Sequence, residues 1–271
     1  MNPLDFLRAT PRTNCGACGH LTCLAFAVAV TKGGADPALC PHLAPSGLVE
    51  ARLNEPGEGL AQVERGQDER DMALVAHLRA KVQCLDYPAI APRLGAEFQP
   101  GPPPALHFRY LGRRVVLSGE AALLEGDRLI DSRDQILLYN YVALGGGQEP
   151  QEVWVGMESL PNSLAKVRTL AAYCEQPLAR SFRGRPAALA RVCSLVGARP
   201  GPEGQSADQG LVIPVLPFLP LYLLFWDEDP DEGFASRVKV LYDQRVLDFL
   251  DIESLVFASE RMAERLMELD A

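Results

Sequence analysis

Apolar residues recur at helical spacing in several parts of this chain. Between Leu60 and Leu85 they lie three or four positions apart, or at sums of these spacings, which indicates one face of a long helix that Gly66 could interrupt. Near the end of the chain, Asp251 can cap a helix whose apolar residues up to Leu269 lie largely on one face. Shorter helices are predicted over residues 132–144, 163–174 and 186–196.

The helix predicted over residues 132–144 has signals at both ends. Ser132 and Gln135 resemble a capping box, which satisfies free backbone donors in the first turn. Glycines 145–147 follow the apolar run, so they favour a C-terminal cap over a phosphate-binding loop, which would precede a helix.

Short apolar or alternating runs predict strands between these helices. Two hairpins, around Gly112 and around residues 126–127, would form an antiparallel meander. The strands are expected at residues 106–110, 114–117, 122–124, 128–130, 153–157, 237–242 and, as a buried pair, within 211–226. Because strands and helices do not alternate regularly, we predict an α+β fold with a mainly antiparallel sheet, preceded by a small helical module.

The polar, glycine- and proline-containing residues 44–59 predict a linker between two domains. The first domain, residues 1–48, would be a small cysteine-rich module with a helical stretch over residues 21–31. The second domain, residues 60–271, would contain the α+β fold.

The longest apolar run spans residues 211–226 and contains three prolines. It is too short and too often interrupted for a membrane-spanning helix, so we expect no membrane span. The first residues lack the pattern of a secretory signal, which predicts a cytoplasmic location. In a reducing compartment, clustered cysteines are more typical of metal ligands than of disulfides.

The net charge of −9 is unevenly distributed. Residues 1–48 have three basic and two acidic side chains, whereas residues 49–271 have 23 basic and 33 acidic ones. A negatively charged body repels phosphate backbones, so we do not expect nucleic acid as a partner.

Four cysteines near the start have the spacing C-x2-C-x4-C-x16-C: Cys15, Cys18, Cys23 and Cys40. They supply enough thiolates for a four-coordinate metal or for each iron of a cubane. Gly16 and Gly19 would let the backbone enclose a cluster. The 16-residue separation of the last pair is unlike zinc knuckles. The spacing favours an iron–sulfur cluster, with zinc and unligated thiols as the alternatives.

Residues 14–27 read NCGACGHLTCLAFA and are followed by Cys40-Pro41. This pattern resembles the four-cysteine domain at the N-terminus of the large subunit of the corrinoid iron–sulfur protein. A looser relative is the cluster domain of an electron-transport subunit in ion-pumping ferredoxin oxidoreductases. The resemblance covers about the first 43 residues and implies that the four cysteines bind one [4Fe–4S] cluster.

The remainder does not show the β/α alternation of the corrinoid protein's barrel. Instead, residues 131–139, 216–220 and 240–243 resemble an uncharacterised domain family that follows this cluster motif in anaerobic bacteria and archaea. That resemblance implies no known activity.

The other cysteines, Cys84, Cys174 and Cys193, lie within apolar helical patterns, so we expect them to pack in the core. His20 and His42 flank cluster ligands and could tune a cluster's potential, or could simply be exposed. His77 and His107 have no recognisable partner motif.

Two charged segments have a functional and a simpler interpretation. Arg180, Arg183 and Arg185 precede a predicted helix start and could bind an anionic ligand, although a solvated basic loop is the simpler interpretation. The acidic residues 227–232 are most simply a solvated turn.

No catalytic motif is recognisable, so the sequence does not decide whether the chain is an enzyme. Four thiolates would leave no iron open to a substrate, so we predict a redox accessory protein that transfers single electrons to or from a partner protein. The resemblances to the corrinoid protein and to the uncharacterised family imply a corrinoid or one-carbon setting in an anaerobe. One alternative is an enzyme whose larger domain binds a small molecule or a second cofactor (corrinoid, haem or flavin) and uses the cluster as an electron inlet. The other is a structural or sensing cluster that controls binding.

Overall fold

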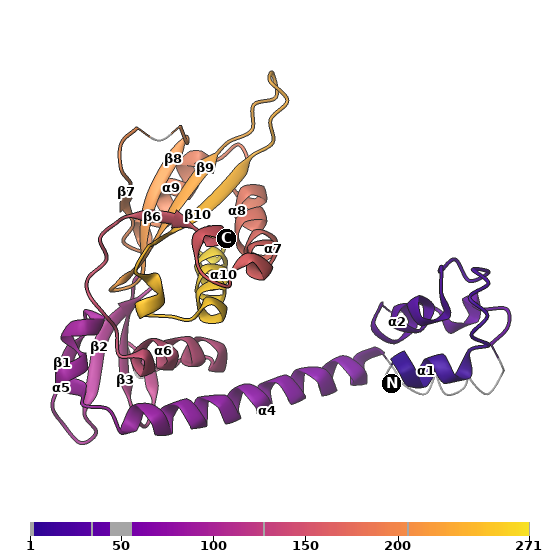
Figure 1. Ribbon diagram of the computed structural model, residues 1–271, viewed down its shortest axis with the longest axis horizontal. Coiled ribbons are helices and arrows are strands. Elements are labelled where there is room, and N and C mark those ends of the chain that lie inside the picture. The colour runs from indigo at the N-terminus through magenta and orange to yellow at the C-terminus, as the bar shows by residue number, and fades with distance from the viewer. Residues whose placement is uncertain (1–2, 34, 44–55, 127, 205, 271) are drawn as a thin grey trace. The chain divides into compact units, whose positions relative to one another are not determined.

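The computed structural model describes residues 3–33, 35–43, 56–126, 128–204 and 206–270. The chain divides into two compact units, Met1–Arg70 and Asp71–Ala271. Figure 1 traces the elements of both units along the chain. No helix in the described ranges has the length and apolar character needed to cross a bilayer.

The N-terminal unit contains two short helices, α1 (Pro3–Ala9) and α2 (Cys23–Gly33). They pack through Phe6 and Phe26, whose ring centroids lie 6.0 Å apart in an edge arrangement. Helix α2 begins where the Thr22 hydroxyl accepts a hydrogen bond from the Ala25 N–H at 3.0 Å, as an N-cap does. The predicted helix in this region is therefore confirmed, whereas α1 was not predicted.

Helix α4 (Pro56–Gln83) crosses the division between the two units. It runs through Gly66 without a break and begins inside the predicted linker. Its last turns bury Val75, Leu78 and Val82 in the core of the larger unit. Residues 44–55 of that linker lie outside the described residues, and the predicted domain boundary stays a prediction.

The first sheet of the larger unit is an antiparallel meander, as predicted. Its strands follow one another in space as they do in sequence: β1 (Glu97–Gln99), β2 (Ala105–Tyr110), β3 (Arg113–Ser118), β4 (Ala122–Leu124) and β5 (Arg128–Leu129). The β2–β3 turn consists of Leu111 and Gly112, both with positive φ, which is the backbone twist that two-residue hairpins favour.

The second sheet has the strand order β6-β10-β9-β8-β7, and all its pairings are antiparallel. Its strands are β6 (Trp154–Gly156), β7 (Arg199–Pro200), β8 (Gln209–Leu216), β9 (Leu219–Trp226) and β10 (Arg237–Asp243). The long apolar run forms the predicted pair of buried strands, β8 and β9. Pro214 lies opposite Pro220 beside a register shift, so the prolines occur where the ladder is already irregular.

Helices flank the two sheets in the larger unit (Figure 1). The α-helices are α5 (Tyr87–Ile90), α6 (Ser132–Leu144), α7 (Leu164–Leu170), α8 (Gln176–Ser181), α9 (Pro186–Leu195) and α10 (Ile252–Glu268). Three short 3₁₀ segments are η2 (Pro92–Leu94), η3 (Met157–Ser159) and η5 (Val246–Asp248). A π-helical segment, η4 (Ala171–Glu175), joins α7 to α8, so the helix predicted to end at residue 174 continues to Ser181.

The start of α6 differs from the predicted capping box. Asp131 is the N-cap, and its side chain accepts a hydrogen bond from the Asp134 N–H at 3.0 Å. Gln135 instead donates to the Ile130 carbonyl at 2.6 Å. The carboxylate of Asp131 therefore takes the capping role that we assigned to Ser132. The predicted end at Gly145 is confirmed, because this residue has a φ of 72° and forms a left-handed C-cap.

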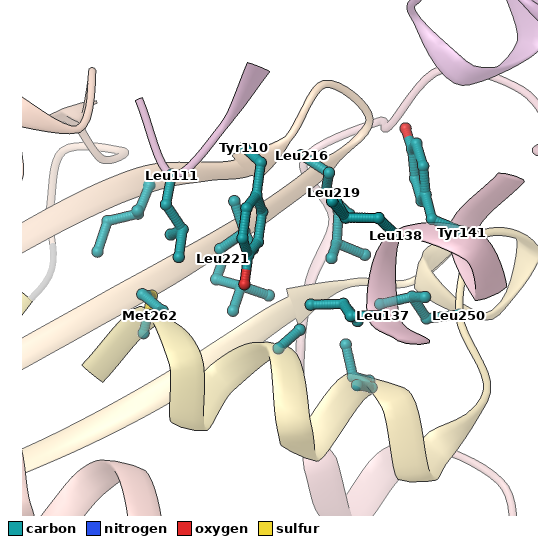
Figure 2. Packing of buried hydrophobic residues seen from close by; sticks show 14 of the residues in the cluster. Tyr110, Leu111, Leu137, Leu138, Tyr141, Leu216, Leu219, Leu221, Leu250 and Met262 are labelled. Atoms are coloured by element: carbon teal, nitrogen blue, oxygen red, sulfur yellow. The ribbon is translucent and has the colours of Figure 1, made fainter. Parts of the chain in front are cut away.

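Side chains from both sheets and from α6 and α10 meet in one core. Figure 2 shows Tyr110 of β2, Leu137 of α6, Leu221 of β9 and Met262 of α10 converging there. A backbone hydrogen bond of 3.0 Å from Leu111 to Val215 also links the β2–β3 turn to β8. The predicted α+β class with antiparallel pairing is therefore confirmed, with two sheets instead of one.

Candidate metal centre

The loop between α1 and α2 contains the first three predicted ligands. Gly16 and Gly19 both have left-handed φ, at 73° and 83°, and Gly19 donates a 2.9 Å hydrogen bond to Gly16. This tight turn contains Cys18. The first residue of α2, Cys23, donates its backbone N–H to the Asn14 side chain at 2.8 Å. Asn14 thereby closes the loop around the cysteines, a role that we did not assign from the sequence.

Cys40 lies directly after a short 3₁₀ turn, η1 (Pro37–Leu39). The side chain of Asp36 caps this turn by accepting a hydrogen bond from the Ala38 N–H at 2.9 Å. Cys40 is buried with Phe6 and Phe26 in the small apolar cluster of the N-terminal unit, and Cys18 packs against the same cluster. The packing therefore brings the last predicted ligand and one of the loop cysteines to a common core.

The four thiols differ in exposure. Cys15 is exposed, Cys18 is half-buried, and Cys23 and Cys40 are buried. Within the described ranges, no three His, Cys, Asp or Glu side chains gather in an arrangement that could hold a metal ion. The ligand set thus stays a prediction from the sequence. Its chemistry fits an iron–sulfur cluster, because all four donors are cysteines and three of them lie within one short loop shaped by two left-handed glycines.

Hydrogen bonding favours the thiolate form of Cys15. The backbone N–H of Ala17 and, to a smaller extent, the Thr13 hydroxyl lower the pKa of this thiol. The thiolate is the form that binds metals. The two nearby histidines differ: the ring of His20 lies 5.5 Å from that of Phe26 and is half-buried, whereas His42 is exposed. Their influence on a cluster stays a prediction.

The remaining cysteines lie in the larger unit, and two of the three are buried as predicted. Cys174 and Cys193 have no exposed surface. Burial raises the pKa of Cys193 to about 12 and raises that of Cys174 well above its ordinary value. The prediction of core packing was wrong for Cys84, which is exposed. This residue directly follows the last residue of α4 and lies on a different side from Val75, Leu78 and Val82, the buried residues of that helix.

The basic loop and the acidic turn that we considered separately contact each other. Arg183 forms an ion pair of 2.5 Å with Glu228, and the Gly184 N–H donates to Asp227 at 2.8 Å. Arg185 pairs with Asp270 at 2.8 Å. Two of the three arginines are thus engaged by carboxylates, and Arg180 is exposed. This arrangement favours the solvated loop over the anionic-ligand site.

A buried ionic network is centred on Asp134. Its carboxylate accepts hydrogen bonds from the Tyr110 hydroxyl at 2.6 Å and from the Arg261 guanidinium at 2.8 and 3.0 Å. Arg113 lies 3.9 Å away. The network therefore joins β2, the start of α6 and α10. Asp134 lies within residues 131–139, one of the segments that resemble the uncharacterised domain family. The sequence did not indicate its hydrogen-bond partners, which lie 24 and 127 positions away.

Comparison with known proteins gives two family matches. Residues 11–42 match a family described as "Putative Fe-S cluster", which supports an iron–sulfur centre in the N-terminal unit. Residues 86–265 match the family described as "Domain of unknown function (DUF3786)". No curated protein and no solved structure matches the chain. The two matches confirm the predicted layout, and because the second covers well over half of the 271 residues, the chain belongs to the DUF3786 family.

Proposed function

We propose that this protein is a one-electron carrier whose N-terminal unit holds a [4Fe–4S] cluster through Cys15, Cys18, Cys23 and Cys40. The family match over residues 11–42 supports the iron–sulfur centre. The observation that carries the proposal is local: Asn14 and the left-handed glycines shape a short loop that contains three cysteines, and Cys40 shares a core with one of them. When four thiolates occupy every iron, a cluster supplies electron transfer and not Lewis-acid catalysis.

The protein's own groups would influence a bound cluster in two ways. The N–H of Ala17 and the hydroxyl of Thr13 stabilise negative charge on Cys15. Burial of Cys23 and Cys40 limits access of water to that side of the site, which affects the reduction potential of a cluster. A separate redox partner protein would then donate or accept the electron.

Metal analysis of anaerobically prepared full-length protein tests the proposal. We expect about four iron and four sulfide per chain, and a paramagnetic signal after reduction. Cys23→Ser should lose most of this iron, because a serine hydroxyl is a poor iron ligand. Cys84→Ser is the matched control, since Cys84 is an exposed thiol in the larger unit and should retain full iron content. Zinc as the only metal, or equal iron in both variants, would refute the proposal.

A corrinoid or one-carbon setting is the finer part of the proposal, and it rests on the resemblance of the first 43 residues. The absorption spectrum of the purified protein tests it, because a bound corrinoid, haem or flavin absorbs visible light in bands distinct from those of an iron–sulfur cluster. A spectrum with cluster absorption alone would leave the electron-carrier proposal intact and would exclude a second bound cofactor that absorbs visible light.

A further inference from the structure

A hollow of about 760 Å³ lies in the larger unit, where the first sheet meets β8 and the end of α9. Its walls are partly apolar, with Leu195, Pro214 and Leu216 among them, and its charged and imidazole side chains come from β1 to β3. The volume lies within the range that small-molecule sites occupy, and the mixture of apolar walls with a few polar groups is typical of such sites.

The polar groups share one face of the first sheet. In β2, the alternation of side chains places Phe108 in the core, so His107 and Arg109 lie on the opposite face. Glu97 of β1 is the direct cross-strand neighbour of His107, and Arg114 of β3 is that of Arg109. Direct neighbours point to the same side of a sheet. Two guanidinium groups, an imidazole and a carboxylate therefore line the hollow together.

The two arginines lack full charge compensation. Like charges directly opposite each other destabilise a sheet. Arg109 donates a 3.0 Å hydrogen bond to the Gly112 carbonyl, and the described residues place no carboxylate within ion-pair distance of it. Arg114 lies 3.8 Å from Glu125, but both side chains are mostly exposed, so water screens this pair. A bound anion would relieve the repulsion between the two guanidinium groups.

The imidazole beside the arginines also has an unsatisfied polar atom. Nε2 of His107 is buried and has no hydrogen-bond partner among the described residues. Buried polar atoms normally have a partner, and leaving one without a partner costs free energy. Because this nitrogen is buried, a ligand in the open part of the hollow does not reach it, and binding there would depend on the two guanidinium groups and the apolar wall.

We propose that this hollow binds a small organic anion. Its phosphate or carboxylate group lies between Arg109 and Arg114, and its apolar body packs against Leu195 and Pro214. Guanidinium groups suit both kinds of head group, because their parallel N–H donors match the oxygens of phosphate and carboxylate. The site lies wholly in the larger unit and does not depend on the cluster.

Isothermal titration calorimetry of the full-length protein tests the site with three probes: phenyl phosphate, benzoate and inorganic phosphate. We expect at least one aromatic anion to bind saturably at one site per chain, and inorganic phosphate to bind more weakly than that anion. Arg109→Ala/Arg114→Ala should weaken binding of that anion at least tenfold. Ser194→Tyr, which adds a ring at an exposed position in the lining, should weaken binding without a change in charge.

The matched control is Arg168→Ala/Arg180→Ala, which removes two exposed guanidinium groups from α7 and α8, outside the hollow, and should bind like the unmodified protein. Circular dichroism establishes that each variant is folded. Three results would overturn the proposal: no saturable binding of any probe, equal affinity in the Arg109/Arg114 variant, or equal weakening in the control. If inorganic phosphate bound as tightly as the aromatic anions, the proposed packing of an apolar body against Leu195 and Pro214 would be wrong.

Discussion

Asp134 shows how one side chain can join distant elements of this fold. It is 2% exposed and accepts hydrogen bonds from Tyr110 and Arg261. Burial and the neighbouring charge of Asp134 raise the pKa of Tyr110 well above its ordinary value. Burial alone would lower the pKa of Arg261, but hydrogen bonding to Asp134 and its charge outweigh that effect and raise it. Both donors therefore keep their protons throughout the physiological range.

Asp134→Asn should destabilise the larger unit by about 3–5 kcal/mol, because it leaves a half-buried guanidinium without its main counter-charge. Chemical denaturation followed by tryptophan fluorescence measures this, since both tryptophans, Trp154 and Trp226, lie in the larger unit. Asp231→Asn, at an exposed position in the acidic turn, is the control and should change stability by less than about 0.5 kcal/mol. A loss of the same size in both variants would show that the Asp134 network makes no specific contribution to the stability of the larger unit.

At the scale of elements, hydrophobic patterning predicted those whose signals are local. The β2–β3 hairpin has its turn at Gly112, and α10 has its cap at Asp251, as expected. Strands β1 and β7 have three and two residues, too few to show a period, and only pairing with their neighbours defines them. The α7–η4–α8 helix reads as ordinary helix in the sequence, because an extra residue in one turn leaves no compositional mark.

The same limit applies to the candidate site. The cysteine spacing alone identified the predicted ligands, but the hydrogen bond from Cys23 to Asn14 depends on the path of the loop. Cys84, which we wrongly predicted to be buried, lies at the end of an apolar pattern. There the periodicity no longer indicates whether a side chain faces the core or the solvent. His107 and Arg109 had no motif, because their neighbours Glu97 and Arg114 come from adjacent strands.

The π-helical segment supports a prediction about pH. Glu175 lies at its end, where one carboxylate oxygen accepts a hydrogen bond from the Val240 N–H at 3.1 Å. Burial raises the pKa of Glu175, and the Val240 N–H and Lys239 offset this only in part. A carboxyl whose pKa is raised in the folded state contributes stability below its unfolded pKa, and that stability is lost as the pH rises through the folded value.

Glu175→Gln should therefore stabilise the protein relative to the unmodified chain as the pH rises above about 4.5, with the smallest difference at the acidic end. Urea denaturation at several pH values from 4 to 8 measures the effect. Glu158→Gln is an informative contrast, because Glu158 pairs with the same lysine but has a lowered pKa. Its effect should have the opposite sign and be small, since its side chain is half exposed. Identical pH dependence in both variants would contradict the argument.

At the scale of the whole molecule, the two units have separate cores in the described part of the chain. The main core extends from Val75 to Leu266, whereas the small one contains residues from Phe6 to Leu43. The two clusters have no residue in common. The candidate cluster ligands lie in the N-terminal unit, where Cys18 and Cys40 contact the small core. The Asp134 network and the proposed anion site lie in the larger unit, so we expect that each can be perturbed separately.

Replacing Cys15, Cys18, Cys23 and Cys40 with serine should remove the iron yet leave thermal unfolding of the larger unit within about 2 °C of the unmodified protein. For a unit of this size, 1 kcal/mol corresponds to roughly 2–4 °C. Tryptophan fluorescence follows this unit alone, because both tryptophans lie in it. Leu221→Ala, in its core, should do the reverse and lower the midpoint by about 4 °C or more while iron content is unchanged. If the serine variant lowered the midpoint as much as Leu221→Ala, the stability of the larger unit would depend on the cluster.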